Sequence, residues 1–485
     1  MDAATLAREA RAQVPGKFRA LEAVDRIIQS VQAAMEQPWD EAMRVTRSGF
    51  EALRQGPQSR ALRHLFFAER EAARRGTQAT PRTVNEVAVI GAGTMGGGIT
   101  ISLLLGGYRV VLIDTAAAGL SKGLERIKRS IEQSVEKGRI TADQAREALA
   151  RLRSAGELET GVPTADLVIE AVFEDMNIKR EIFGQLDSLC APHAILATNT
   201  STLDIDRIAS AVRRPQSVIG MHFFSPANIM RLLEIVRGAD TAPDVLATAQ
   251  ALARRVGKIG VVVGNCFGFV GNRMLYAYGR ENQFMLLEGA TPGQIDRALQ
   301  AFGMAMGPNA VGDLAGLDVG YQVRRARTDL PDDPRYYRAA DLLVEQGRLG
   351  QKSGKGAFVY EGGTRKDDSR VHALLRAEAE RLGIRQRDVS DREIVERCIM
   401  ALINEGAKLL GEGIAASAAD IDVIWCNGYG FPRHRGGPMF HAQSIGLAQV
   451  LAAVRQFQAS MGSDYWAPAP LLEERVRTEK STWAD

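Results

Sequence analysis

The first 75 residues carry apolar side chains at helical rather than alternating spacing. One such stripe consists of Leu21, Val24, Ile27, Ile28 and Val31. Proline and glycine at 15–16, 38 and 56–57 divide the region into short helices, and the stretch from Gly76 to Arg82 has the composition of a linker. We therefore expect a short helical segment over residues 1–80.

From Val84 onward, short apolar runs alternate with helical spans. Strands are expected at residues 87–90, 109–114, 167–172, 194–198, 218–224, 232–236 and 260–263. Strands that alternate with helices are typical of a doubly wound α/β sheet with parallel strands at its centre. We expect one such domain over residues 81–266.

After Asn265 the chain turns helical, and it does so twice in the same order. The order is Glu-Gly, Ile-Asp, a glycine-rich turn and Gly-Pro, first at Glu288, Ile295, Gly303 and Gly307 and again at Glu412, Ile421, Gly428 and Gly437. Such a repeat indicates a duplicated supersecondary unit. We expect a duplicated all-helical domain, with a first copy at 267–385 and a second at 386–485.

Length and charge exclude several classes of protein. The 485 residues suffice for about three domains. The 61 Lys and Arg residues nearly balance the 58 Asp and Glu residues, so we expect no nucleic-acid partner. The most apolar window, residues 87–113, is interrupted by glycine clusters. It therefore favours a soluble βαβ unit over membrane insertion.

The cysteines and the two chain ends suggest a compartment. Cys190, Cys266, Cys398 and Cys426 have no metal-binding spacing, so we expect reduced core thiols and no metal site. No apolar stretch follows the first residues, and the last three residues are no peroxisomal signal. Together these features predict a cytoplasmic protein.

A glycine-rich motif follows the first expected strand. In it, Gly91 permits a tight turn, Gly93 a close approach to a pyrophosphate, and Gly96 close helix–strand packing. Asp114 ends the second strand about 20 residues later, where the acid that binds a ribose 2′-hydroxyl is expected. A carboxylate there repels a 2′-phosphate, so we expect a Rossmann-type site for NAD. The alternative, a glycine turn that binds nothing, does not explain the strand before the motif or the acid after it.

A histidine and a glutamate lie on two neighbouring expected strands. His222 lies near the end of the run 218–224, and Glu234 lies in the run 232–236. If the two strands fold back on each other, the carboxylate can bind one ring nitrogen and leave the other free to act as a general base. The alternative is a histidine packed in the core beneath two phenylalanines. Together with the NAD site, the pair favours alcohol oxidation.

Several motifs in one order resemble those of the L-3-hydroxyacyl-CoA dehydrogenases of fatty-acid β-oxidation. They are GAGTMG from Gly91, 169–174 with Lys179, 199–201, His222-Phe-Phe with Glu234, and 268–273. The resemblance covers residues 85–320, and the second helical copy is similar to the C-terminal half of the fused, peroxisomal-type multifunctional enzymes. Residues 58–70 resemble the tail of their hydratase part, whose catalytic core we expect to be absent.

The resemblance implies reversible NAD-dependent oxidation of (S)-3-hydroxyacyl-CoA to 3-ketoacyl-CoA. It implies that His222 is the base, that Glu234 holds its imidazole, and that Ser201 and Asn272 bind the hydroxyl and the developing carbonyl. The cofactor-binding residues that it implies are Gly91, Gly93, Thr94, Met95, Gly96, Asp114, Glu174, Lys179 and Asn199. Of these, Glu174 and Lys179 would line the nicotinamide-ribose side.

Ser130 and Lys137 match positions that contact coenzyme A in similar enzymes. They are seven residues apart, which places them on one helix face. A solvated helix explains the pair equally well, because Lys128 and Arg129 are close by.

Two other functional interpretations stay open. One is a hydroxy-acid dehydrogenase of the 6-phosphogluconate type, which also joins a nucleotide domain to a helical domain. The other is a non-catalytic remnant of a multifunctional enzyme. Because short family members pair through a single helical domain and this chain carries two copies, the resemblance implies a monomer. A separate hydratase or thiolase is a candidate partner.

Overall fold

The computed structural model describes residues 2–75 and 78–484. Two residues of the predicted linker, 76 and 77, lie outside the described residues. The chain divides into two compact units. Unit 1 contains the described residues up to Phe67, Met274–Lys408 and those from Gly430 onward, and unit 2 contains Ala68–Arg273 and Leu409–Tyr429. The domain boundaries predicted above stay a prediction.

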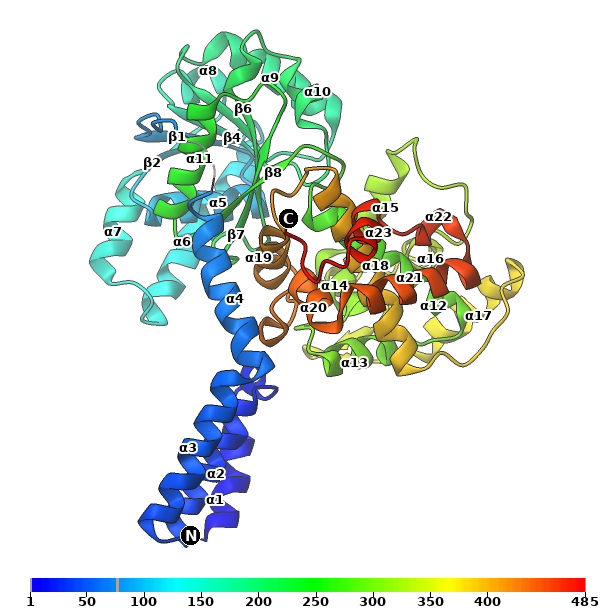
Figure 1. Ribbon diagram of the computed structural model, residues 1–485. Helices are drawn as coiled ribbons and strands as arrows, with labels where there is room; N and C mark the ends of the chain where they lie inside the picture. Colours follow the sequence, from blue (N-terminus) through cyan, green and yellow to red (C-terminus); the bar gives the residue numbers. More distant parts are fainter. Residues whose placement is uncertain (1, 76–77, 485) are drawn as a thin grey trace. The chain divides into compact units, whose positions relative to one another are not determined.

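An eight-stranded sheet forms the centre of unit 2 (Figure 1). Its strands are β1 (Glu86–Ile90), β2 (Arg109–Ile113), β3 (Leu152–Ala155), β4 (Leu167–Glu170), β5 (Ile195–Thr198), β6 (Val218–Phe223), β7 (Leu232–Arg237) and β8 (Ile259–Gly264). In space they follow the order β3-β2-β1-β4-β5-β6-β7-β8. All neighbouring strands are parallel except β6 and β7. The predicted doubly wound sheet is confirmed.

Helices cover both faces of this sheet. They are α5 (Thr94–Leu105), α6 (Ala117–Glu136), α7 (Ala142–Ala150), α8 (Leu158–Gly161), α9 (Met176–Leu189), α10 (Ile205–Ala209) and α11 (Pro243–Arg255). On one face, Ile99 of α5, Ile127 of α6 and Leu252 of α11 join one buried apolar cluster with alternate strand residues. On the other face, α8 lies against β2 and β3, and α10 lies against β6. The sheet is therefore buried on both sides, as parallel sheets require.

The edge strand β3 was not predicted. Its sequence, Leu-Arg-Ser-Ala, contains no apolar run, and the side chains of Arg153 and Ser154 are exposed. The strand forms because β2 offers a free parallel edge, where Val110 to Ile113 pair with Leu152 to Ala155. This pairing is a tertiary effect that local pattern does not encode.

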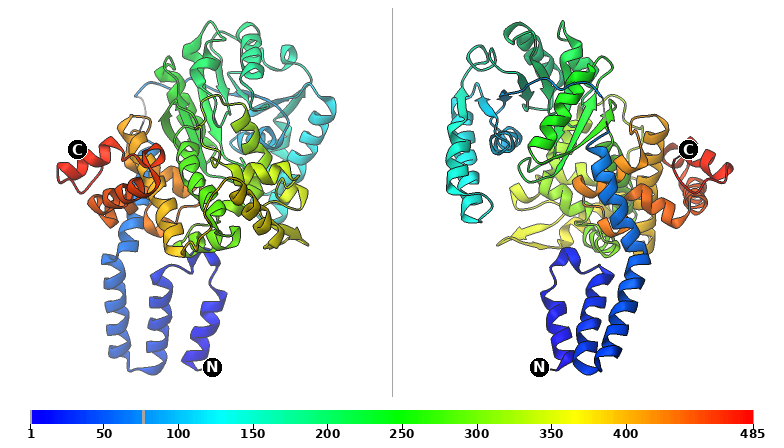
Figure 2. Two further views of the ribbon diagram at one scale, coloured as in Figure 1. Left: turned by 90° about the vertical axis from the view of Figure 1, so that its right-hand side faces the viewer. Right: turned by 60° about the vertical axis from the view of Figure 1, so that its left-hand side comes forward.

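Unit 1 begins with the helices α1 (Ala3–Gln13), α2 (Glu22–Glu36) and α3 (Trp39–Gln55), which lie side by side (Figure 2). The helical character of this segment is confirmed, and the breaks fall at the predicted proline and glycine positions. The predicted stripe is only partly buried: Ile28 is covered, whereas Ile27 and Val31 are exposed. A segment of three helices has no second layer to bury both sides of a wide stripe.

Three helices contain residues of both units: α4 (Pro57–Ala72), α12 (Gly271–Glu288) and α18 (Asp391–Gly411). The other helices of unit 1 are α13 (Pro292–Phe302), α14 (Pro308–Ala315), α15 (Leu317–Arg325), α16 (Arg338–Glu345), α17 (Ser369–Arg381), α20 (Pro438–Ile445), α21 (Leu447–Met461), α22 (Ser463–Trp466) and α23 (Pro470–Arg477). Short 3-10 turns lie at η1 (Gly16–Phe18), η2 (Pro215–Ser217), η3 (Gln351–Ser353) and η4 (Arg433–Arg435).

Helices at corresponding positions of the predicted repeat have equal lengths. Helices α13 and α19 (Ala418–Gly428) both have 11 residues, and α14 and α20 both have 8. Gly316 and Gly446, which follow the eight-residue helices, both have a positive φ, 94° and 104°. Each eight-residue helix also starts with proline, which suits the first helical turn. These matches agree with a duplicated helical domain.

One part of the first copy is not helical. Strands β9 (Val359–Glu361) and β10 (Thr364–Lys366) form an antiparallel hairpin around Gly362 and Gly363. Both glycines have a positive φ, 55° and 80°. Two adjacent residues of positive φ suit a two-residue hairpin turn. The expectation of an all-helical domain is wrong here, because the Gly-Gly pair is a hairpin signal in its own right.

None of the helices in the described part of the chain combines the length and the apolar character that crossing a membrane would take.

Candidate active site

Most of the predicted site residues follow the carboxyl ends of parallel strands. Strands β1, β2, β4 and β5 are mutually parallel neighbours, so their carboxyl ends meet at one edge of the sheet. The glycine turn follows β1, Asp114 follows β2, Glu174 follows β4, and Asn199 follows β5. This edge is where open α/β sheets bind their ligands.

The antiparallel pair of β6 and β7 joins His222 to Glu234. The two residues are directly opposite in the strand register. Nδ1 of His222 lies 2.7 Å from Oε2 of Glu234, and the side chains are 8% and 0% exposed. Because the carboxylate of Glu234 accepts a hydrogen bond from the N–H at Nδ1, Nε2 keeps its lone pair. The predicted pairing of His222 with Glu234 is therefore present.

The second oxygen of Glu234 and the ring of His222 are also held. Oε1 of Glu234 accepts a hydrogen bond of 2.9 Å from the backbone N–H of Gly271. The imidazole packs against Phe224 and Phe269, with ring centroids 4.4 Å and 5.9 Å away. With both oxygens engaged and two rings in contact, neither side chain can turn freely.

Ser201 and Asn272, the two predicted partners of the substrate oxygen, are brought together. The side-chain amide of Asn272 donates to the backbone carbonyl of Ser201 at 3.1 Å. The Oδ1 atom of Asn272 accepts a hydrogen bond of 2.8 Å from the hydroxyl of Tyr429. Tyr429 was not predicted as part of the site, because it lies in the second helical copy. The glycines on either side of it, Gly428 and Gly430, were its only local signal.

Glu174 organises the loop that carries Ser201. Its Oε1 atom lies within 3.2 Å of the backbone N–H groups of Ser201 and Thr202 and of the hydroxyls of Thr200, Ser201 and Thr202. Burial opposes ionisation, but the charge of Lys179 and these hydrogen bonds outweigh it and lower the pKa of Glu174. Glu174 therefore stays ionised and holds the loop. The hydroxyl of Ser201 donates to Glu174 and keeps its lone pairs for a substrate.

Lys179 lies deeper than predicted. Its side chain is 1% exposed, and Nζ lies 2.6 Å from Oε1 of Glu170 and 3.6 Å from Oε2 of Glu174. Glu170, which is fully buried, also accepts from the hydroxyl of Thr198 at 2.6 Å. Sequence reasoning missed Glu170 because it ends an apolar strand and resembles a core position. Lys179 thus links Glu174 to a buried carboxylate.

The glycine turn and Asp114 are joined directly. The carboxylate of Asp114 accepts from the backbone N–H groups of Ala92 and Ala116 at 2.8 Å and 3.0 Å. Gly91 has a φ of 99°, which favours glycine. A Cβ at Gly96 would lie 1.8 Å from the carbonyl oxygen of Gly91, whereas a Cβ at Gly93 would meet nothing within 4 Å. Gly96 therefore serves packing, and Gly93 leaves open space beside the turn.

Comparison with known families agrees with this geometry. Residues 86–266 match the model for the NAD binding domain of 3-hydroxyacyl-CoA dehydrogenase, and residues 268–360 and 394–482 match the model for its C-terminal domain. The chain belongs to the 3-hydroxyacyl-CoA dehydrogenase family. The match of one C-terminal domain model to two stretches is what a duplicated domain predicts.

The chain is similar to longer curated members of this family. It is 42% identical over 469 residues to the peroxisomal bifunctional enzymes of Cavia porcellus and Homo sapiens, an alignment that includes 92% of this chain and 64% of each relative. It is 35% identical over 466 residues to the fatty acid oxidation complex subunit alpha of Shewanella amazonensis, and covers 64% of it. The chain thus spans just under two thirds of the length of these relatives.

Solved structures of this family share the fold. The 3-hydroxybutyryl-CoA dehydrogenase of Escherichia coli is 26% identical with a TM-score of 0.69, and the match covers 82% of this chain and 99% of that one. The dehydrogenase part of multifunctional enzyme 1 from C. elegans is 28% identical with a TM-score of 0.61, and the match covers 85% and 96%.

The residues of the family's NAD binding domain fit the cofactor. Thr94 is the exposed first residue of α5, and Met95 packs partly against the apolar core. Asn199 accepts a hydrogen bond of 2.8 Å from the backbone N–H of Phe223. The open space at Gly93 lies where the helix begins, and backbone N–H groups at a helix N-terminus favour a phosphate. These residues could hold the pyrophosphate and the two riboses.

Replacing Gly93 with alanine is expected to raise the dissociation constant for NADH at least about tenfold with little change in unfolding temperature. The added methyl group has room in the chain but occupies the space beside the turn. Gly96→Ala is the matched control, because its Cβ collides with the backbone and lowers both NADH affinity and stability. NADH fluorescence titration and thermal unfolding separate the two effects. Unchanged affinity in Gly93→Ala would contradict the assignment.

The predicted contacts for coenzyme A lie in the second half of α6 and at its C-cap. Ser130 is partly buried, and its hydroxyl lies 3.4 Å from the amide nitrogen of Asn228. Lys137 is exposed and caps the helix immediately after Glu136. An exposed Lys137 is compatible with a lysine that only faces solvent and with a lysine that binds a phosphate of coenzyme A.

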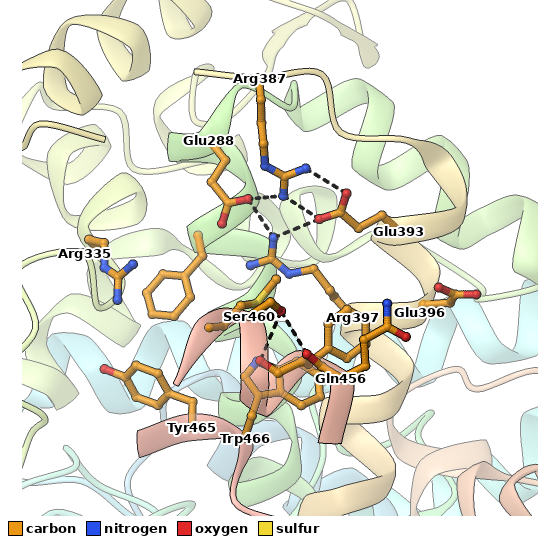
Figure 3. A pocket seen from close by; sticks show the side chains of 13 residues that line it. Glu288, Arg335, Arg387, Glu393, Glu396, Arg397, Gln456, Ser460, Tyr465 and Trp466 are labelled. Atoms are coloured by element: carbon orange, nitrogen blue, oxygen red, sulfur yellow. Dashed lines mark hydrogen bonds and ion pairs between the residues drawn. The ribbon is translucent and has the colours of Figure 1, made fainter. Parts of the chain in front are cut away.

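A pocket of about 670 Å³ in unit 1 contains none of the predicted site residues (Figure 3). Its side chains come from α12, α18, α21 and α22 and the loops around Arg335 and Arg387. Arg397 is fully buried there and lies 2.8 Å from Glu288 and 3.4 Å from Glu393, and Arg387 lies 2.5 Å from both carboxylates. The two arginines neutralise the two glutamates. These ion pairs connect a helix of the first predicted copy to a helix and a loop of the second.

Proposed function

We propose that this chain catalyses the reversible NAD-dependent oxidation of (S)-3-hydroxyacyl-CoA to 3-ketoacyl-CoA. The observation that carries the proposal is the His222–Glu234 pair, 2.7 Å apart and opposite in register, within a domain that matches the family's NAD binding domain. The names of the relatives, which include a peroxisomal bifunctional enzyme and a fatty acid oxidation complex subunit, support a role in fatty-acid β-oxidation.

His222 acts as the general base in this proposal. The 3-hydroxyl gives its proton to Nε2, and Glu234 stabilises the imidazolium that forms. Bound at the glycine turn and Asp114, NAD would supply the acceptor for the hydride that leaves C3 of the substrate. The hydroxyl oxygen of Ser201, whose own proton is directed to Glu174, can accept from the 3-hydroxyl, and an N–H of Asn272 donates to the oxygen that becomes the carbonyl. In the reductive direction the imidazolium returns the proton to that oxygen.

The proposal is tested by following NADH absorbance with acetoacetyl-CoA and with a longer 3-ketoacyl-CoA. Consumption of NADH that depends on the thioester supports it, and the ratio of the two rates gives the preference for chain length. Turnover of 6-phosphogluconate or a similar sugar acid, with none of acetoacetyl-CoA, would favour the other hydroxy-acid class. Binding of NADH without any turnover would favour a non-catalytic remnant.

We propose Ser130 and Lys137 as contacts of the coenzyme A portion. Lys137→Glu is then expected to raise the KM for acetoacetyl-CoA about threefold to tenfold at low salt, because it replaces attraction of a phosphate with repulsion. The KM for NADH and kcat should change little, and the effect should shrink as salt screens the charges. Lys122→Glu, an exposed lysine on the same helix, is the control. Equal KM values in both variants would favour a solvated helix.

Compartment and assembly remain proposals. The sequence favours the cytoplasm, whereas several relatives are named as peroxisomal enzymes; fractionation of the source cells decides between them. We propose a monomer, because two helical copies are present in one chain, and light scattering tests this. A separate hydratase or thiolase stays a candidate partner that co-purification would detect.

A further inference from the structure

A segment of the second helical copy completes unit 2. Residues Leu409–Tyr429 belong to this unit, although unit 1 residues precede and follow them in the chain. At the edge of the sheet, the backbone N–H of Gly264 donates to the carbonyl of Ile414 at 2.8 Å, and Val263 forms an antiparallel bridge with Ala415. Arg273 binds Glu412 through two hydrogen bonds of 2.6 Å and 2.8 Å. Helix α19 also lies against β7, the strand of Glu234.

The ring of Tyr429, which follows α19, is held from three sides. It stacks on Trp425 with centroids 4.7 Å apart and planes at 21°, and it meets Phe224 edge-on at 5.4 Å. At Gly271, an added Cβ would lie 2.4 Å from atoms of the Tyr429 ring. A side chain at Gly271 would therefore displace the ring. This packing fixes the direction in which the hydroxyl points.

The hydroxyl of Tyr429 helps to determine the orientation of the side-chain amide of Asn272. A backbone carbonyl only accepts hydrogen bonds, so the carbonyl of Ser201 requires the NH₂ end of the Asn272 amide to face it. Oδ1 is then left for the proton of Tyr429. Burial, together with the negative charge of Glu234, raises the pKa of Tyr429 well above its usual value, so the phenol keeps that proton.

One N–H of the Asn272 amide remains available. Of its two N–H groups, one is directed to Ser201, and the other has no acceptor within residues 2–75 and 78–484. If the amide turned over, its oxygen would face the carbonyl of Ser201, and the two acceptors would repel. The contacts of Ser201 and Tyr429 thus select the same orientation.

We propose that Tyr429 is a positioning residue that fixes the amide of Asn272 so that an N–H, and not the carbonyl oxygen, faces the substrate oxygen. The second helical copy thereby supplies a side chain that prepares the active site. The inference rests on the proposed dehydrogenase function, in which Asn272 binds the oxygen that becomes the carbonyl.

The test is Tyr429→Phe in the full chain, assayed with acetoacetyl-CoA and NADH. Loss of one hydrogen bond that orients the amide is expected to lower kcat about tenfold. The KM for acetoacetyl-CoA is expected to change less than twofold, because the N–H matters most when charge develops on the oxygen. The dissociation constant for NADH and the unfolding temperature should stay close to those of the unmodified chain.

A double-variant cycle separates positioning from a general structural role. In an Asn272→Ala background, Tyr429→Phe should change kcat less than twofold, because the amide it orients is gone. The matched control is Tyr337→Phe, which removes a tyrosine hydroxyl that donates to the carbonyl of Tyr276 at 3.0 Å in unit 1. It is expected to leave kcat unchanged.

Several outcomes would overturn the inference. They are an unchanged kcat in Tyr429→Phe, losses that multiply with those of Asn272→Ala, and a kcat loss accompanied by lost NADH binding or by unfolding. The proposed function fails in a different way. In that case the unmodified chain itself does not turn over acetoacetyl-CoA, whatever residue occupies position 429.

Discussion

Replacing His222 with glutamine is expected to lower kcat with acetoacetyl-CoA and NADH by about 10²- to 10⁴-fold. Glutamine fills a similar volume but does not exchange a proton at neutral pH. Because the base acts mainly in the transition state, the KM for acetoacetyl-CoA and the dissociation constant for NADH should change little. Steady-state kinetics and NADH fluorescence measure the three quantities.

Two further variants define what the loss in His222→Gln means. Glu234→Gln keeps one acceptor oxygen, which can bind Nδ1 of His222 or the backbone N–H of Gly271 but not both, and it removes the charge that stabilises an imidazolium. Its kcat should fall between those of the unmodified chain and His222→Gln. His372→Gln, on α17 in unit 1, is the matched control and should leave kcat unchanged. A loss in His222→Gln that appears in KM alone would contradict a role as base.

Replacing Lys179 with methionine is expected to destabilise the protein by about 3–5 kcal/mol. Lys179 and Glu170 are 1% and 0% exposed, and their charged atoms are 2.6 Å apart. Without the ammonium group, Glu170 remains as a buried negative charge, and Glu174 loses the cation that lowers its pKa. Urea unfolding followed by circular dichroism measures the change in the free energy of unfolding.

Two further variants test whether the loss of stability in Lys179→Met comes from the buried ion pair. A Lys179→Met, Glu170→Leu double variant should recover part of the lost stability, because the buried charge of Glu170 is removed, while Glu174 still lacks its cation. Lys122→Met removes an exposed lysine and should change stability by less than about 0.5 kcal/mol. A loss below about 1 kcal/mol in Lys179→Met would show that the pair is not needed as an ion pair.

The sequence predicted the part of the site that depends on one hairpin. His222 and Glu234 lie on consecutive antiparallel strands, so their separation in the chain determines their pairing once the strands are recognised. The proximity of the glycine turn and Asp114 could be predicted in the same way, because consecutive parallel strands bring their carboxyl ends together. Local pattern and simple topology suffice for such residues.

Other features depend on residues that meet only in the folded chain. Asn272 and Tyr429 are joined by one hydrogen bond, but no periodicity relates residues so far apart in sequence. Glu170 ends an apolar strand, and only the position of α9 reveals that it pairs with Lys179. The strand β3 requires the edge of β2, and the exposure of Ile27 and Val31 depends on what covers α2. These features follow from packing, which the pattern of apolar residues does not determine.

The assignment of Leu409–Tyr429 to unit 2 affects how the protein can fold during synthesis. A ribosome delivers the chain from its N-terminus, and domains usually fold in that order. Here the outer strand β8 can be translated long before Ile414 and Ala415, the residues that cap its edge, leave the exit tunnel. A nascent dinucleotide-binding domain would therefore present one open sheet edge until these residues are translated.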